Sequence, residues 1–158
     1  MKFLCKTKLG DFLAGFEHDY LISLEFPGDF AKSFIKFNYI SGNIQKFEHE
    51  LNNYIEGNKK YIDFPYKLIN ISDSKKFILE KLKDKVLYGK TLTYSELGNI
   101  CNVKNPRIIG QAMKINPIPI VIPCHRVLSK NPLKKYYSPG VFYKDFLLEL
   151  ENSNKTKI

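Results

Sequence analysis

The sequence predicts an α/β protein in two parts: a small antiparallel sheet with helices, followed by a mostly helical part that contains a helix-turn-helix. Three patterns predict this class. Apolar residues alternate at a period of two over residues 3–26, a helical period begins near residue 44, and two short capped helices occupy residues 93–114. The length of 158 residues and the hydrophobic content of 44% suit one ordinary domain or two small ones. We expect an N-terminal domain over 1–70 and a C-terminal domain over 71–158.

The strand pattern at the start of the chain is clearest around its middle. Phe12, Ala14 and Phe16 occur at every second position, and similar alternation precedes and follows them. Turn-forming dipeptides at 10–11 and 18–19 interrupt the alternation. The segment therefore predicts three short antiparallel strands with one buried face.

Two helical stretches follow these strands, and only the second has clear limits. It ends at Gly57, a typical helix C-cap, and places four apolar side chains on one stripe: Ile44, Phe47, Leu51 and Ile55. Residues 59–71 contain Pro65 and lack a helical period. We expect them to form an extended linker.

The second part of the chain has stronger helix signals. Asp73 can cap a helix that ends at Gly89 and buries Ile78, Leu79, Leu82 and Val86. Thr93 and Glu96 have the spacing of a capping box, and Asn105 precedes Pro106 as the cap of a further helix. These two short helices have the layout of a helix-turn-helix.

The faces of the two short helices differ in character. The predicted buried positions are Leu97, Ile100 and Cys101 in the first helix, and Ile108, Ile109 and Ala112 in the second. The opposite stripe of the second helix is polar and basic and consists of Arg107, Gln111 and Lys114. Such a stripe is typical of a nucleic-acid-binding helix, and equally of a solvated helix surface.

Charge is distributed unevenly along the chain. The net charge is +9, and all of it lies in residues 81–158, because residues 1–80 are neutral. A basic half joined to a neutral half suggests that one half meets a polyanion, although solubilising lysines are an equal alternative. Only Arg107 and Arg126 are arginines, so both are candidates for stacking or forked hydrogen bonding that lysine cannot provide.

Several classes of protein are excluded at this stage. No run of about 18 apolar residues exists, so we expect no membrane-spanning segment, and charged residues interrupt any signal peptide. The three cysteines are too scattered for a disulfide framework and suggest a reducing compartment, which predicts a cytoplasmic protein.

Residues 116–127 contain the most reactive combination of side chains. They read Asn-Pro-Ile-Pro-Ile-Val-Ile-Pro-Cys-His-Arg-Val, and the prolines exclude a helix. We expect a buried extended strand that ends at Pro123 and presents Cys124 at a fixed point. Neighbouring His125 and Arg126 would lower the pKa of the thiol, which makes Cys124 a candidate nucleophile.

Other interpretations of Cys124 remain open from these residues alone. The thiol could be inert, or it could join a disulfide in an oxidising compartment. A metal site is a further alternative, but Cys5, His18, His49 and Cys101 lack ligand spacing, so we expect neither a metal nor another cofactor.

Longer motifs around Cys124 carry a family resemblance. Residues 123–127 (Pro-Cys-His-Arg-Val) resemble the active-site signature of the O6-alkylguanine-DNA alkyltransferases, also called methylated-DNA–protein-cysteine methyltransferases. Residues 88–94 resemble the family's turn into its helix-turn-helix, and residues 106–113 its recognition helix. Residues 116–119 resemble its approach to the cysteine, and residues 144–148 its last helix. The resemblance covers residues 75–151. It implies a ribonuclease-H-like N-terminal domain and a winged-helix-like C-terminal domain.

The resemblance also implies a reaction and a set of catalytic residues. The Cys124 thiolate would take the alkyl group from O6-alkylguanine in one irreversible turnover, with O4-alkylthymine as a second substrate left open. His125 would accept the thiol proton through a water, and Glu151 would orient His125. Asn116 would tie the preceding turn to the helix-turn-helix, and Tyr94 would donate a proton to the leaving guanine.

Further residues are implied to bind the base and the DNA. Tyr137 and Ser138 would hold the base, the Val127 and Cys124 carbonyls would accept from its amino group, and Lys144 would assist Tyr94. The target nucleotide would be flipped out of the duplex, with Arg107 filling the gap and Gln111, Ala112 and Lys114 along the minor groove. The partner is then double-stranded DNA, bound by a monomer.

One loop departs from the family pattern. Residues 129–140 carry Pro139 where the family typically has glycine, together with two unusual lysines, so the width of the pocket is an open question. The alternative function is a non-catalytic helix-turn-helix protein that flags lesions or regulates transcription, although proteins of that kind lack the cysteine. A Cys-His hydrolase is a third possibility, and it would need His18 or His49 beside Cys124.

Overall fold

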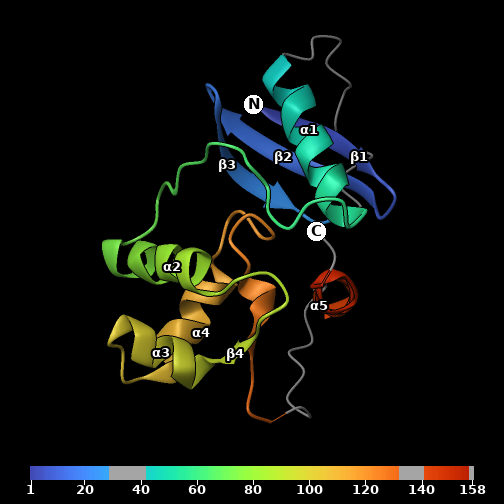
Figure 1. Ribbon diagram of the computed structural model, residues 1–158. Coiled ribbons are helices and arrows are strands. Elements are labelled where there is room, and N and C mark those ends of the chain that lie inside the picture. The colour runs from blue at the N-terminus through green and yellow to red at the C-terminus, as the bar shows by residue number, and fades with distance from the viewer. Residues whose placement is uncertain (29–41, 132–140, 157–158) are drawn as a thin grey trace. The chain divides into compact units, whose positions relative to one another are not determined.

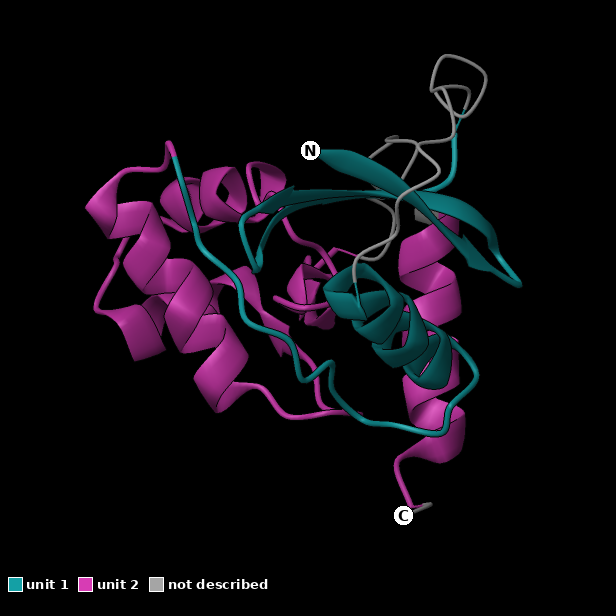
Figure 2. Cartoon of the chain, turned by 90° about the horizontal axis from the view of Figure 1, so that it is seen from above, with its two compact units in different colours: residues 1–69 teal, residues 70–158 magenta. Residues whose placement is uncertain are grey.

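A computed structural model describes residues 1–28, 42–131 and 141–156 of the chain. The chain divides into two compact units, Met1–Ile69 and Asn70–Ile158 (Figure 2). Over these residues the protein has an α/β fold with one small antiparallel sheet and the helices α1 to α5 (Figure 1). None of the described helices is long and apolar enough to cross a membrane.

The sheet of the first unit is the predicted three-stranded meander. Its strands are β1 (Lys2–Thr7), β2 (Gly10–Glu17) and β3 (Tyr20–Glu25), and β2 pairs antiparallel with both neighbours. The prediction of one buried face is wrong for β2, because Leu13 is buried as deeply as the alternating Phe12 and Ala14. This central strand is therefore covered on both faces.

A cluster of aromatic rings joins helix α1 (Gly42–Ile55) to the sheet. The predicted stripe of α1 is buried, and its Phe47 meets Phe16 of β2 with ring centroids 5.6 Å apart. Phe64 packs edge-on against both rings, at 5.9 Å from Phe16 and 5.2 Å from Phe47. Residues 59–71 are extended, as predicted, and they contribute Phe64 to the core. The other predicted helical stretch lies outside the described residues.

Helix α2 (Asp73–Lys85) opens the second unit. The prediction that Asp73 caps this helix is wrong: Ser72 is the N-cap, and Asp73 is the first helical residue, where its charge suits the helix dipole. The helix also ends earlier than predicted, at Lys85. Gly89 instead takes a positive φ of 76° in the loop that follows.

The helix-turn-helix consists of α3 (Tyr94–Cys101) and α4 (Pro106–Lys114). The Thr93–Glu96 capping box and the Asn105 cap with Pro106 at the first position are both present, as predicted. The turn between the helices packs tightly against Gly98 of α3, where an added Cβ would lie 2.6 Å from the carbonyl oxygen of Val103. A glycine is therefore required there.

A short parallel ladder brings distant segments of the second unit together. Strand β4 (Leu92–Thr93) leads into α3, and β5 (Val127–Leu128) follows the 3₁₀ helix η2 (Cys124–Arg126). Leu92 pairs with Val127 and Thr93 with Leu128. Helix α5 (Val141–Asn154) completes the unit. The ladder places the end of the Cys124 segment beside the start of the helix-turn-helix.

Candidate active site

Cys124 is positioned by a compact turn and not by the predicted strand. Residues 118–123 form a turn with an isolated bridge between Pro119 and Ile122, and Cys124 begins η2. Ile120 has a positive φ of 73°, which reverses the chain, and the flanking prolines cannot supply ladder donors. Cys124 is half-buried, and the residues on both sides of it, 120–123 and 125–127, are buried.

Asn116 fixes this turn from the end of α4. Its amide nitrogen donates to the Ile122 carbonyl oxygen at 2.9 Å, and its amide oxygen accepts from the Ile118 backbone nitrogen at 3.1 Å. The same side chain hydrogen-bonds Cys124. Asn116 lies two residues after the last residue of α4, and its role in tying the turn to the helix-turn-helix stays a prediction.

Three buried side chains contact one another: His125 and Arg126, which follow Cys124 in the chain, and Glu151. His125 Nε2 lies 2.7 Å from Glu151 Oε1, and the Arg126 Nε and Nη2 atoms donate to the same carboxylate at 2.8 to 3.1 Å. The backbone nitrogen of Gly89 also donates to Glu151, at 3.2 Å. The carboxylate from α5 is thus the common partner of η2 and of the loop before β4.

The ionisation of these groups follows from their burial and their neighbours. Despite burial, hydrogen bonds and charges from His125 and Arg126 lower the pKa of Glu151 from 4.5 to about 2. Burial lowers the pKa of His125, and Arg126 and Lys144 add to that, while Glu151 acts in the opposite direction. At neutral pH the triad is therefore a carboxylate, a guanidinium and a neutral imidazole.

The Cys124 thiol is not activated in the way its neighbours predict. Burial raises its pKa, and the hydrogen bond from Asn116 and the charge of Lys144 offset this only in part. The prediction of a lowered thiol pKa is wrong because His125 is neutral and Arg126 is directed to Glu151. A resting thiol needs a base to remove its proton, and the Nδ1 atom of His125 is buried with no hydrogen-bond partner within the described ranges.

Further predicted site residues of the second unit are Tyr94, Lys144, Tyr137 and Ser138. Tyr94 is half-buried at the start of α3, and the nearest atom to an added Cβ on Gly110 of α4 would be its ring, at 4.0 Å. Lys144 Nζ donates to the Val127 carbonyl oxygen at 2.7 Å, and its assistance to Tyr94 stays a prediction. Tyr137 and Ser138 lie outside the part of the chain that the structure describes.

The exposed side of α4 is more apolar than its sequence predicts. Arg107, Gln111 and Lys114 are exposed, as predicted. Ala112 is completely buried, so its assignment to the DNA-contacting side is wrong: it packs in the core of the unit. Ile108, predicted to be buried, is 38% exposed, and the buried position is taken by Met113. Ile100 of α3 is also exposed, contrary to prediction.

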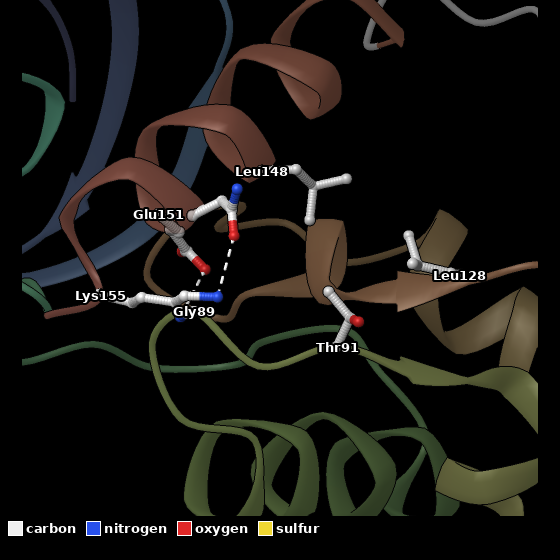
Figure 3. Close-up of a pocket in the computed structure, with 7 residues that line it drawn as sticks. Gly89, Thr91, Leu128, Leu148, Glu151 and Lys155 are labelled. Atoms are coloured by element: carbon white, nitrogen blue, oxygen red, sulfur yellow. Dashed lines mark hydrogen bonds between the residues drawn. The ribbon is translucent and has the colours of Figure 1, made fainter.

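A cavity lies between α5 and the loop before β4, and Glu151 is one of its lining residues (Figure 3). Gly89, Thr91, Leu128, Leu148, Glu151, Asn152 and Lys155 line it. Figure 3 shows the Glu151 carboxylate turned toward Gly89. Lys155 Nζ donates to Asn152 Oδ1 at 3.1 Å. Cys124 and His125 do not line this cavity, so a substrate bound in it would not contact the thiol. Over residues 1–28, 42–131 and 141–156, no three His, Cys, Asp or Glu side chains form a metal site.

Sequence reasoning missed two members of this arrangement. The Gly89 backbone nitrogen and the Val86 carbonyl oxygen, which accepts from Arg126 Nη1 at 2.7 Å, are backbone atoms and have no residue-type signal. Arg126, one of the two candidates for forked hydrogen bonding, forms such bonds with Glu151. The retention of arginine in a lysine-rich chain was the available signal.

Residues 75–153 match the family model described as 6-O-methylguanine DNA methyltransferase, DNA binding domain. A methylated-DNA–protein-cysteine methyltransferase from Methanocaldococcus jannaschii is 45% identical over 89 residues, which is 56% of this chain and 51% of that protein. The protein of the same name from Pyrococcus furiosus is 48% identical over 71 residues, which is 44% of this chain and 39% of that protein. The chain thus spans about half the length of the curated relatives it matches.

Solved structures align over nearly the whole chain. The O6-methylguanine-DNA methyltransferase from Pyrococcus kodakaraensis superposes with a TM-score of 0.69 at 28% identity, covering 96% of each chain. The Mycobacterium tuberculosis OGT in complex with DNA superposes with a TM-score of 0.78 at 24% identity, covering 96% of this chain and 92% of that one. The latter likeness concerns the fold.

Proposed function

Because the chain belongs to the 6-O-methylguanine DNA methyltransferase family, we propose that it repairs DNA by transferring an alkyl group from guanine O6 to its own Cys124. One observation carries the proposal: the motif cysteine adjoins a buried histidine that is bonded to Glu151 at 2.7 Å. This arrangement provides a nucleophile, a base and a carboxylate that orients the base. The substrate is O6-alkylguanine in DNA, and O4-alkylthymine is a second candidate.

The chemistry can be written with each proton accounted for. His125 Nδ1 accepts the thiol proton through a bridging water, the sulfur forms a bond to the alkyl carbon, and the bond between that carbon and O6 breaks. Tyr94 donates a proton to the guanine as it leaves, because a neutral leaving group departs more easily than an anion. The product is a thioether at Cys124, which has no route back to the thiol. Each molecule therefore reacts once.

The second unit supplies the DNA surface in this proposal. We place the DNA-binding and alkyl-transfer domain at residues 71–158, with a winged-helix-like arrangement, and a ribonuclease-H-like domain at residues 1–70. The exposed Arg107, Gln111 and Lys114 of α4 face the minor groove, and Arg107 fills the stack left by the flipped nucleotide. Tyr137, Ser138 and the Val127 carbonyl hold the base. The protein acts as a monomer in the cytoplasm.

The experiment is mass spectrometry of the protein after incubation with duplex DNA that contains O6-methylguanine. We expect one added methyl group per molecule, on Cys124, and none in Cys124→Ser. Cys101→Ser is the matched control and should take up the methyl group as the wild type does, because Cys101 is buried at the end of α3. Specific DNA binding without any mass gain would contradict the proposal and favour a non-catalytic lesion-binding protein.

The role of α4 has a separate test in DNA affinity. Lys114→Ala should weaken binding to all sequences alike and reduce the dependence of log affinity on log salt concentration by about one unit, as expected for one lost phosphate contact. Arg107→Ala should reduce the transfer rate more than the affinity, because the flipped state loses its stacking partner. Equal salt slopes for the wild type and Lys114→Ala would contradict this placement of α4.

A further inference from the structure

The proposed reaction assigns no role to Arg126, the third member of the buried triad. Its guanidinium is only 6% exposed and makes three of the hydrogen bonds to Glu151. One of them, from Nη2 at 2.8 Å, ends on Oε1, the same oxygen that lies 2.7 Å from His125 Nε2. The histidine and the arginine thus share one carboxylate oxygen.

We propose that Arg126 is a positioning residue for the transfer reaction: it holds the Glu151 carboxylate in a neutral ion pair and so keeps the His125 imidazole free to accept the thiol proton. This inference rests on the proposed alkyl transfer and extends it to a residue outside the cysteine, histidine and glutamate set.

The first step of the argument is charge balance. A lone buried carboxylate beside an imidazole favours the imidazolium, because an opposite charge at hydrogen-bond distance stabilises the charged form. With Arg126 present the carboxylate is already compensated, and protonation of His125 would leave a net positive charge in a buried cluster. The neutral imidazole is the form that this cluster favours.

Apart from Glu151, the charged group that influences His125 acts in the same direction as Arg126. On α5, Lys144 lies close enough for its charge to lower the pKa of His125, and Glu151 is the only anion among the charged groups that influence the ring within the described residues. Cys124 is a thiol at rest because burial raises its pKa. In the loop before β4, the ring of Tyr88 lies 5.8 Å from the Arg126 guanidinium, and burial raises the pKa of its hydroxyl.

The second step concerns the tautomer of His125. Glu151 remains ionised down to very low pH, with its pKa lowered to about 2, so its oxygens only accept hydrogen bonds. The Nε2 atom of His125 must then carry a hydrogen and donate it to Oε1. The lone pair is left on Nδ1, the buried atom with no partner among the residues that the structure describes. A neutral histidine in this tautomer is the base that the thiol needs.

The third step explains why the residue is an arginine. The Nε and Nη2 atoms reach the carboxylate while Nη1 donates to the Val86 carbonyl oxygen at 2.7 Å. A lysine ammonium cannot span a two-oxygen acceptor and a separate carbonyl with fixed planar geometry. Substitutions can therefore separate the positive charge of Arg126 from its fixed hold on the Glu151 carboxylate. Arg126→Gln removes both, and Arg126→Lys keeps only the charge.

The test is an NMR titration of the His125 ring nitrogens in the free protein, with the pH profile of single-turnover transfer measured in parallel. In Arg126→Gln we expect the midpoint for His125 to rise by about one pH unit, a tenfold change in its proton affinity. The transfer rate should then fall most at pH 6 and recover toward alkaline pH. In Arg126→Lys the midpoint should stay near the wild-type value, while the rate falls at all pH values.

Controls separate this effect from general loss of charge or structure. Arg107→Gln makes the same substitution on the exposed α4 and should leave the His125 titration unchanged. The resonances of His18 and His49 in the first unit serve as internal references. An unchanged midpoint in folded Arg126→Gln would overturn the proposal.

The wild-type protein gives a second test that does not depend on a variant that folds. At pH 7 its His125 should be neutral with the hydrogen on Nε2, and an imidazolium or the other tautomer would overturn the proposal. A wild-type protein that shows this tautomer and the expected shift in Arg126→Gln, but takes up no methyl group, would overturn the proposed function and support the charge arrangement.

Discussion

Each of the two units buries a glutamate, and the two glutamates serve different ends. Glu50 in α1 is 6% exposed and accepts from Lys59 Nζ at 2.6 Å and from the Asp63 backbone nitrogen at 3.1 Å. Glu151 in α5 is 1% exposed and accepts from Arg126 and His125. The first carboxylate binds an extended segment to a helix, and the second binds the histidine that follows Cys124 in the chain.

The difference lies in the partners and not in the carboxylates. Lys59 is 41% exposed on its side chain, so water can hydrate its ammonium whenever the pair opens. Arg126 and His125 are both buried, so neither can exchange Glu151 for water without disturbing η2 and the loop before β4. A buried carboxylate acquires a chemical role when a titratable group that faces a reactive atom depends on it.

The largest expected effect separates the two glutamates by activity. Glu151→Gln should slow alkyl transfer by roughly 10²–10⁴-fold, the usual contribution of a positioned general base, because His125 loses the anion that fixes its tautomer. Glu50→Gln should leave the rate within about twofold, since its pair lies in the other unit and a hydrogen-bonded side chain remains. Single-turnover kinetics with methylated duplex DNA measures both, and equal rates would show that Glu151 is no more than structural.

Stability should separate the same two sites less strongly. Glu151→Ala leaves a buried guanidinium without its anion and should cost about 3–5 kcal/mol in the free energy of unfolding. Glu50→Ala should cost only about 1–2 kcal/mol, because the exposed Lys59 regains water. Urea unfolding of both variants at pH 7 makes the measurement. A larger loss for Glu50→Ala would mean that the first unit depends on its ion pair as a core element.

The response to acid should proceed in two steps that belong to the second unit. The pKa of His125 is lowered from 6.5 by burial, so the folded state binds fewer protons there and stability falls as the pH drops below about 6.5. The pKa of Glu151 is lowered from 4.5 to about 2, so its contribution is complete above pH 4.5 and is lost between pH 4.5 and 2.

Unfolding free energies at pH 7, 5.5, 4 and 2.5 test this order. Glu151→Gln should flatten the decline between pH 4.5 and 2, because the unfolded variant no longer takes up that proton. Glu50→Gln should keep most of the decline, although the pKa of Glu50 is also lowered, by the hydrogen bond from Lys59 against its burial. An acid profile that Glu151→Gln leaves unchanged would contradict the assignment.

Elements with local signals could be predicted from the sequence, and those set by distant contacts could not. The meander in the first unit follows from alternation and turn residues, and the capping box at Thr93 follows from spacing. The segment before Cys124 has strand-forming residues, but its positive φ at Ile120 and its closure by Asn116 depend on the fold around it. Periodicity likewise misplaced Ile108, because a nine-residue helix allows two interpretations of its buried face.

The site was predictable where chemistry is carried by side chains in a motif. The motif predicted Cys124 and His125, the family resemblance added Glu151, and the structure brings the last two into contact. The lowered thiol pKa was mispredicted because adjacency in sequence does not reveal which way a cation points. Arg126 faces Glu151 and not the sulfur, and the charge of Lys144 offsets the burial of the thiol only in part.

The smallest effect is expected at a third glutamate, which is exposed. Glu96 accepts from the Thr93 backbone nitrogen, and Thr93 Oγ1 accepts from the Glu96 backbone nitrogen at 3.2 Å. Thr93→Ala should therefore cost about 1 kcal/mol in the free energy of unfolding, the usual value for a lost helix cap. Glu96→Gln is the control, since glutamine can also close a capping box and should change stability less than Thr93→Ala does. If Glu96→Gln lowered the free energy of unfolding as much as Glu151→Ala does, burial would not determine how much each of the three carboxylates contributes to stability.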